Sequence, residues 1–358
     1  MIGPYPAPRT MFKARLTEQR ICEMSSAVRR RSRGAAIALP LAACLLVSAC
    51  GGGEEPEGAQ QEPGADGFPR TVTHAMGETT VEAAPERVVA LDTSYIDAAM
   101  ALDLDVVARI DYHTEGGELP SYLDESERAN AESAEVIGDI TAPDIEALWD
   151  IESDLIVSAQ VRHEEIYPEL SEVAPTVFSQ TTGATWKDNI RLLAEAVGRE
   201  ELAEERITAY EERAESIGTA IREKLGNDAT VTMARFVEGE PTVRLYTSAS
   251  FPGIVLADAG LARPEGQPDS EDDIMVNLSQ EDITDLDADH IFLSAYSDPT
   301  QEAEDPREQF ESNPLWDRLE ADITSVDDTV WVTSVSLQGA EQMLDELADA
   351  FEVEGARS

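Results

Sequence analysis

The sequence predicts two α/β lobes joined by one long helix. The first observation is a repeated pattern: a short helix, an acidic turn and a β-prone run occur at 144–157 and again, in the same register without gaps, at 281–292. The second is that short apolar runs alternate with helical stripes, which favours parallel sheets covered by helices on both faces. The third is a proline-free helical stripe at 199–226, which at about 1.5 Å per residue would reach about 40 Å.

The two copies of the repeat carry acidic residues at matching positions. Glu146 aligns with Glu281, and Asp154 aligns with Asp289. Many α/β proteins have a helix followed by an acidic turn and a strand, so chance similarity of the two segments is the alternative interpretation. If the copies are equivalent, they form half of a βαβ unit in each lobe and place one carboxylate at the same position on both.

Residues 1–49 are predicted to be an export signal. Arginines at 29–33 precede the apolar run 35–47, which is too short for a comfortable membrane span. The following Leu46-Val47-Ser48-Ala49-Cys50 resembles a bacterial lipobox, in which the cysteine is lipidated and becomes the first residue of the mature chain. An ordinary signal peptide with an incidental cysteine is the alternative. A start at Met24 would give a signal of normal length.

Composition limits the class of protein. Asp and Glu number 73 against 26 Lys and Arg, for a net charge of -47, which disfavours nucleic acid and anionic lipid as partners. Cys22 and Cys44 would leave with the signal, so the folded part has no disulfide and no thiolate metal site. Residues 50–70, with the lipidated cysteine at their start, are too poor in apolar residues to order themselves and are expected to form a flexible linker.

Strands and helices alternate through the first lobe, expected at 71–198. The apolar runs predict strands at 88–91, 106–110, 136–138, 155–158 and 175–178, and helices are expected at 96–102, 145–151, 166–170 and 190–197.

The second lobe, expected at 227–358, has fewer and more separated signals. Two strands, 230–237 and 243–247, flank a Gly-Glu-Pro turn. Further elements are expected as a helix at 254–259, the second repeat at 281–293, a helix opening at Pro314, a last strand at 330–332 and a closing helix at 340–351.

Several short sequence motifs spread along the chain resemble those of a known family. They are Pro85-Glu86-Arg87-Val88-Val89-Ala90-Leu91, Asp144-Ile145-Glu146-Ala147-Leu148 with Ser153-Asp154-Leu155-Ile156-Val157, Leu170-Ser171-Glu172-Val173-Ala174-Pro175-Thr176-Val177 and Asn313-Pro314-Leu315-Trp316. In this order and spacing they resemble the ABC-transporter periplasmic binding proteins for ferric siderophores and cobalamin, the class III fold. The resemblance covers nearly the whole chain after the linker.

The resemblance implies a function. A lipid-anchored, extracytoplasmic solute-binding protein would capture a ferric siderophore in the cleft between its lobes and deliver it to an ABC permease dimer for iron uptake. Iron would arrive as part of the ligand, with no cofactor, and we expect a monomer. In this family a glutamate on each lobe docks on basic residues of the permease, and the matching positions are Glu146 and Glu281. Carboxylates favoured by a helix dipole are the alternative for this pair.

Ligand residues are expected on the loops at the carboxyl ends of the strands. Arg235 is the strongest candidate, because family members meet anionic oxygens around iron with arginines and a buried arginine needs a partner. A buried carboxylate partner within the protein is the alternative. Replacing Arg235 by Ala should weaken binding with little change in fold. The other candidates are Arg109, Arg162, Tyr95, Tyr246, Tyr296 and Trp331.

Other functions remain as alternatives. A receptor of the same fold for cobalamin or haem is one, and a surface hydrolase that uses carboxylates is another, although no Gly-x-Ser-x-Gly, His-Glu-x-x-His or Walker loop is present. The four histidines show no metal-ligand spacing, which disfavours binding of bare metal. Arginines favour an anionic catecholate or carboxylate chelate, whereas the negative net charge favours a hydroxamate or mixed chelate.

Overall fold

The structure, a computed structural model, describes residues 67–112, 118–226, 229–296 and 306–355. All of them belong to one compact unit. The predicted signal, the lipobox and Cys50 lie outside the described residues.

The first lobe is built on five parallel strands. Their order across the sheet is β5-β4-β3-β8-β9, and every described neighbour pair is parallel. The central strands are mostly apolar and largely buried on both faces, as is typical of parallel sheets; β8 is buried along its whole length. The bounds are β3 (Arg87–Ala90), β4 (Asp105–Arg109), β5 (Glu135–Val136), β8 (Leu155–Ala159) and β9 (Thr176–Ser179).

Helices cover this sheet at the four places that the sequence predicts, and two more short helices, at 125–129 and 160–163, were not predicted. Helix α1 begins after Asp92, whose carboxylate accepts the Ser94 N–H at 3.0 Å, and α6 ends at Gly198 in the left-handed conformation that glycine favours. The bounds are α1 (Thr93–Ala101), α2 (Glu125–Ala129), α3 (Ile145–Ile151), α4 (Gln160–His163), α5 (Tyr167–Val173) and α6 (Trp186–Val197). Two short hairpins were not predicted: β1 (Arg70–His74) with β2 (Gly77–Val81), and β6 (Gly138–Asp139) with β7 (Ala142–Pro143).

The second lobe has a mixed sheet. The order of its strands is β12-β11-β10-β13-β14. Strand β13 pairs in parallel with both β10 and β14, whereas β11 pairs antiparallel with both β10 and β12. The predicted turn at 239–241 reverses the chain and makes β10 and β11 a hairpin. The bounds are β10 (Val231–Val237), β11 (Val243–Tyr246), β12 (Met275–Leu278), β13 (His290–Tyr296) and β14 (Asp322–Ser325).

The helices of the second lobe include one correction. The strand expected at 330–332 is wrong: residues Thr329–Thr333 form a π-helix. Val330 and Trp331 are both buried in succession, and Trp331 stacks on Phe292 and donates its Nε1–H to Glu346 at 2.6 Å. Strand β8 of the first sheet is also buried at every residue, so the π-helix is explained by these tertiary contacts of Trp331 rather than by consecutive burial. The other helices are α8 (Phe251–Asp258), α9 (Arg307–Glu311) and α10 (Leu337–Ala350), with 3₁₀ turns at Ile283–Leu286 and Trp316–Arg318.

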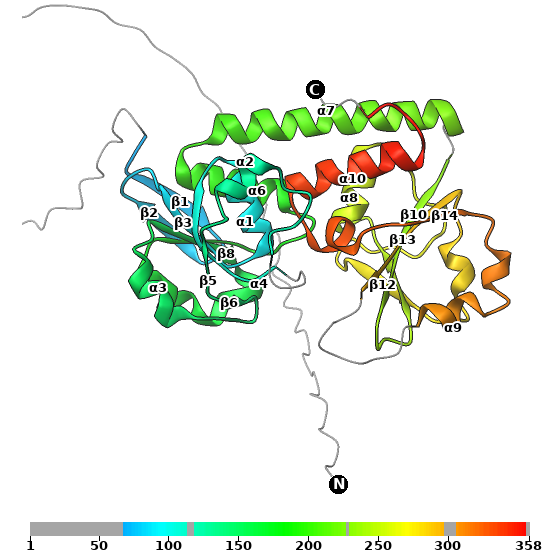
Figure 1. The fold of residues 1–358 in the computed structure, drawn as a ribbon, viewed down its shortest axis with the longest axis horizontal. Helices are drawn as coiled ribbons and strands as arrows, with labels where there is room; N and C mark the ends of the chain where they lie inside the picture. The colour runs from blue at the N-terminus through cyan, green and yellow to red at the C-terminus, as the bar shows by residue number, and fades with distance from the viewer. Residues whose placement is uncertain (1–66, 113–117, 227–228, 297–305, 356–358) are drawn as a thin grey trace, which may run out of the picture. The chain divides into compact units, whose positions relative to one another are not determined.

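Helix α7 (Glu200–Leu225) links the lobes. Its 26 residues span about 39 Å at 1.5 Å per residue, and Figure 1 shows it extending from the first lobe to the second. It packs on α6 of the first lobe and on α8 and α10 of the second. On its α8 side Gly218 allows a close approach, because a Cβ there would lie 1.6 Å from the carbonyl oxygen of Ala259.

Polar contacts also cross between the lobes. Lys187 of α6 places its Nζ 3.0 Å from Asp258 of α8 and 2.8 Å from Glu211 of α7. The Tyr210 hydroxyl donates to the same Asp258 at 2.9 Å. Gln338 of α10 donates to the carbonyl oxygen of Asp97 in α1 at 2.9 Å. The two lobes are therefore tied together by more than the linking helix.

The two copies of the sequence repeat occupy equivalent places. The strands that follow them, β8 and β13, pair in parallel with β3 and β10 respectively. Asp154 accepts the backbone N–H of Arg87 at the start of β3 at 3.0 Å, and Asp289 accepts that of Thr230, just before β10, at 2.7 Å. The copies differ in their helix, since the second has only a 3₁₀ turn.

Candidate ligand-binding site

A polar cluster lies toward the carboxyl ends of β10 and β13. Arg235 on β10 is directly opposite Arg244 on β11 and Ser294 on β13. Residues opposite one another, and residues two apart in a strand, share a face of the sheet. Tyr246 and Tyr296 therefore lie on this face too, and the second lobe presents two arginines and two tyrosines there.

Arg235 is held by a carboxylate. Its Nε lies 2.7 Å and its Nη2 2.5 Å from the two oxygens of Asp328, and both side chains are buried. Ser294 donates its hydroxyl to the same carboxylate at 3.0 Å, and the guanidinium lies 4.8 Å above the Tyr296 ring. The buried partner considered in the sequence analysis is thus present, and a contact of Arg235 with ligand stays a prediction.

Arg244 was missed in the sequence analysis. Its Nε donates to Glu240 at 2.9 Å, and this pairing raises the pKa of Arg244 and lowers the pKa of Glu240. Burial raises the pKa of Tyr246, while the positive charge of Arg235 opposes the rise. The sequence feature that could have identified Arg244 is the alternation Val-Arg-Leu-Tyr in β11, which places Arg244 and Tyr246 on one face of the strand.

On the first lobe, Arg162 lies beside the loop after β3. It is on α4, directly after β8, and its Nε is 3.1 Å from the carboxylate of Asp92. Asp92 is also the N-cap of α1. The Arg162 side chain is 43% exposed, so it can contact a ligand without leaving Asp92.

Arg109 ends β4 and is buried. Its Nη1 donates to the carbonyl oxygen of Ile110 at 3.1 Å, and its guanidinium lies 5.4 Å above the Tyr112 ring. Burial lowers the pKa of Arg109. Its predicted contact with ligand is untested.

Tyr95 and Trp331 pack inside the protein. Their exposed fractions are 1% and 0%, and both belong to the main hydrophobic core. A ligand could reach either side chain only after core residues moved. The structure therefore gives both residues a packing role, and we leave them outside the site proposed below.

Glu146 and Glu281 are both exposed at the start of their repeat. Helix α3 is capped by Asp144, whose carboxylate accepts the Ala147 N–H at 3.2 Å, rather than by Glu146. Glu146 lies in the first turn of α3, where the helix dipole favours a carboxylate, so the helix-dipole alternative still applies to it. Docking on a permease stays a prediction for both glutamates.

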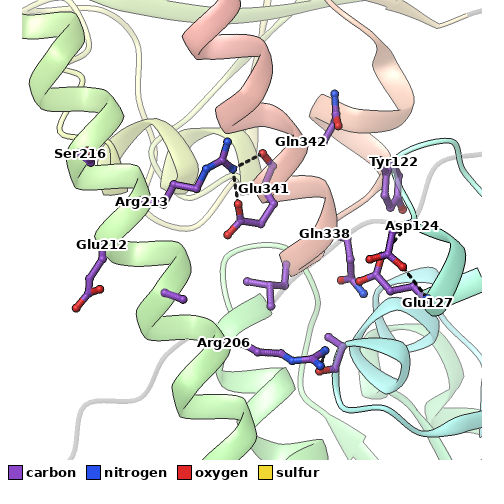
Figure 2. A pocket seen from close by; sticks show the side chains of 13 residues that line it. Tyr122, Asp124, Glu127, Arg206, Glu212, Arg213, Ser216, Gln338, Glu341 and Gln342 are labelled. Carbon is purple, nitrogen blue, oxygen red and sulfur yellow. Dashed lines mark hydrogen bonds and ion pairs between the residues drawn. The ribbon is translucent and has the colours of Figure 1, made fainter. Parts of the chain in front are cut away.

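A pocket of about 560 Å³ lies on α7 and α10 beside the first lobe. Arg213 of α7 forms ion pairs with Glu341 and Asp345 of α10 there. Figure 2 shows Arg206 and Arg213 on one helix facing Gln338 and Glu341 on the other. None of the predicted ligand residues lines this pocket, so it is distinct from the polar cluster.

Among the described residues, no group of three or more His, Cys, Asp or Glu side chains is placed to hold a metal ion. No helix there is both long and apolar enough to cross a membrane.

The fold and the paired lobes define a class of protein. Residues 88–324 match the periplasmic binding protein family. The chain belongs to this family, and it is a substrate-binding protein with the class III fold of two α/β lobes and a linking helix.

Individual relatives agree with this class. The chain is 33% identical over 324 residues to the probable siderophore-binding lipoprotein YfiY of Bacillus subtilis, covering 87% of this chain and 95% of that protein. It is 25% identical to the Fe(3+)-citrate-binding protein YfmC of the same organism, over 78% of this chain and 84% of that one. Staphylococcus aureus SirA complexed with staphyloferrin B has a similar structure, with a TM-score of 0.71, 25% identity, and coverage of 80% of this chain and all of SirA.

Proposed function

We propose that this chain captures a ferric siderophore between its lobes and delivers it to an ABC permease for iron uptake. The observation that carries the proposal is the cluster of two arginines and two tyrosines on one face of the second sheet. Relatives named for siderophores and for Fe(3+)-citrate support the choice of ligand class. Cobalamin and haem receptors are not favoured by these relatives.

The proposed site joins residues from both lobes. From the second lobe we include Arg235, Arg244 and Tyr296, and from the first Arg162, with Arg109 at the end of β4. Tyr246 is 3% exposed and belongs to the same hydrophobic core as Tyr95 and Trp331, so it is left outside the site with them. Guanidinium groups donate charge-assisted hydrogen bonds to carboxylate or catecholate oxygens, but Nε and Nη2 of Arg235 and of Arg244 are already used on Asp328 and Glu240. The Tyr296 ring can cover an apolar surface of the chelate.

The net charge of the cluster limits the net charge of the chelate that it can bind. Arg235 is paired with Asp328, and Arg244 with Glu240, so these four side chains sum to zero net charge. A chelate with a small net charge fits this balance without displacing either carboxylate. A strongly anionic chelate would have to draw an arginine away from its partner.

Anchoring and transfer complete the proposal. Lipidation of Cys50 would place the mature chain on the outer face of the membrane, with the residues before 67 as a linker. The linker expected up to 70 is too long, because Phe68 is buried in the core and Arg70 begins β1. Two or more acyl chains would hold it firmly, because one chain binds only marginally. The protein would act as a monomer, with Glu146 and Glu281 meeting the two permease subunits. Replacement of Cys50 by Ala should release the protein from membranes.

The decisive experiment is a titration of the mature chain, with Cys50 replaced, with ferric hydroxamates, ferric catecholates, ferric citrate, haem and cobalamin. Binding is followed by calorimetry and by tryptophan fluorescence. Saturable, submicromolar binding of one ferric chelate class is the expected result, on the order of -8 kcal/mol or more favourable. Saturable binding of haem or cobalamin alone, or of none of the five, would refute the siderophore assignment.

A further inference from the structure

A tryptophan stands out on the surface of helix α3. The side chain of Trp149 is 57% exposed, although α3 buries Leu148 and Ile151 against the first lobe. Of the three other tryptophans in the described ranges, Trp186 and Trp331 are almost completely buried, and Trp316 is partly buried against the core of the second lobe. A large exposed aromatic side chain is informative because it forgoes the free energy that burial would provide.

Acidic side chains surround this tryptophan. Residues three apart are neighbours on a helix surface, so Glu146 and Trp149 lie side by side, with Asp150 next to them. All three are exposed. The outward face of α3 thus combines an aromatic ring with carboxylates, and a complementary surface would carry cationic side chains, which pair with the carboxylates and stack on the indole.

The second lobe has carboxylates at the matching positions of its repeat but no tryptophan. In the alignment of the two repeats, Glu281 and Asp285 take the places of Glu146 and Asp150, and all four are exposed. The buried positions correspond as well, since Ile283 and Leu286 match Leu148 and Ile151. At the place of Trp149 the second lobe has the exposed Thr284. The lobes therefore present the same charges but different apolar surface.

We propose that Trp149 is the apolar contact of the first lobe with a permease subunit and that it fixes which lobe meets which subunit. This inference rests on the proposed function. Carboxylates alone would attract basic residues equally on both lobes, so they give no preferred orientation. An aromatic side chain present on one lobe only distinguishes the two orientations, and aromatic residues often carry much of an interface's binding energy.

The charge of the chain favours a basic protein partner over other occupants. A second copy would bring its own large negative charge to an acidic surface, and anionic lipid would be repelled in the same way. A permease surface with lysines and arginines around an apolar recess would be attracted at long range and would bury the indole at short range.

The test measures docking without any chelate. The mature chain, with Cys50 replaced so that no lipid anchor binds the bilayer, is titrated onto nanodiscs that hold the ABC permease whose deletion stops iron-chelate uptake in the source bacterium, and empty nanodiscs serve as the blank. We expect Trp149→Ala to weaken docking at least tenfold, or about 1.4 kcal/mol, and Trp149→Phe to retain most of it. Leu225→Ala, which removes another exposed apolar side chain at the end of α7, is the matched control and should dock as the wild type does.

The outcomes separate this inference from the proposed function. Unchanged docking of Trp149→Ala would overturn the role of the tryptophan, whether or not the chain binds a ferric chelate. Loss of chelate binding in Trp149→Ala would instead place the residue at the ligand site and also overturn it. Sedimentation that shows a wild-type dimer and a monomeric Trp149→Ala variant would assign the surface to a second copy of the chain.

Discussion

Arg235 and Asp328 form a buried pair in which both carboxylate oxygens accept from one guanidinium, at 2.7 and 2.5 Å. The residues are far apart in sequence, on β10 and just before the π-helix, and the pair fixes the guanidinium beside Tyr296. The arginine is thus positioned before a ligand arrives, and its removal would leave a buried carboxylate without its partner.

The pair changes what the Arg235→Ala variant can show. Breaking a buried ion pair by removing one partner costs about 3–5 kcal/mol, because the remaining charge is uncompensated. We therefore expect Arg235→Ala to be destabilised, contrary to the small change in fold that the sequence analysis anticipated. Urea unfolding of the variant checks this, and an unchanged midpoint would show that Asp328 finds another partner or is protonated.

A double variant separates stability from binding. Arg235→Gln with Asp328→Asn removes both charges and keeps hydrogen-bonding groups at both positions, so its unfolding free energy should lie nearer to the wild type than that of Arg235→Ala. If Arg235 contacts the chelate, the double variant should lose at least about tenfold in affinity for the ferric chelate. Calorimetric titration measures the affinity, and an affinity equal to that of the wild type would remove Arg235 from the site.

The sequence predicted the lobes because their signals are local. Runs such as Leu155 to Val157 are apolar and rich in β-branched residues, and each identifies its own strand regardless of what packs on it. The long helix was predicted because its stripe contains no proline. The repeat was found for the same reason, since matching residues keep their spacing along the chain.

Features that depend on distant residues could not be predicted in this way. Nothing in the local sequence of Arg235 indicates that Asp328 is its partner. The run Val330-Trp331-Val332 has the composition of a strand, and only its packing on Phe292 and α10 makes it a π-helix. Tyr95 and Trp331 were predicted to contact the ligand because they are aromatic and lie near strand ends. Their almost complete burial depends on residues distant in sequence, so the local sequence does not indicate it.

Docking through the two glutamates can be tested against a charge-matched control. Glu146→Ala with Glu281→Ala should leave affinity for the ferric chelate unchanged and abolish uptake by cells, because both side chains are exposed and lie outside the ligand cluster. Glu78→Ala with Glu215→Ala removes two other exposed carboxylates and should transport normally. Normal uptake by the first variant, or a loss of ligand affinity, would argue against a docking role.

Asp97 should give the stability of the protein an unusual pH dependence. Its carboxylate is fully buried and accepts hydrogen bonds from Tyr112 and Tyr122, and burial raises its pKa to about 7. In the unfolded chain the pKa is about 3.9. Between about pH 4 and pH 7 the native state therefore holds more protons than the unfolded state, and this group makes stability fall as pH rises.

The Asp97→Asn variant isolates that contribution. The amide does not titrate, so the unfolding free energy of the wild type relative to the variant should decrease as pH rises from about 5 to about 7 and become constant above that range. The decrease should approach ~1.4 kcal/mol per pH unit for one proton. Urea unfolding of both proteins at several pH values measures the difference. A difference independent of pH would show that Asp97 has an ordinary pKa.

Gly218 sets how closely α7 approaches α8. A Cβ at this position would lie 1.6 Å from the Ala259 carbonyl oxygen and 2.5 Å from its carbon, and both are backbone atoms that cannot rotate away. Gly218→Ala must therefore push the helices apart, although alanine favours the helical conformation by about 1 kcal/mol. Overpacking of this kind costs about 1–3 kcal/mol, and a rigid backbone contact lies at or above that range.

The expected result for Gly218→Ala is a lower urea midpoint and a weakened link between α7 and the second lobe. Thr208→Ala, at an exposed position of the same helix, is the control and should stay within about 0.5 kcal/mol of the wild type. Hydrogen exchange should rise in α8 and along the facing part of α7 in the glycine variant, while the first-lobe sheet remains protected. If Gly218→Ala were as stable as Thr208→Ala, the close contact of the two helices could not be what holds α7 on the second lobe.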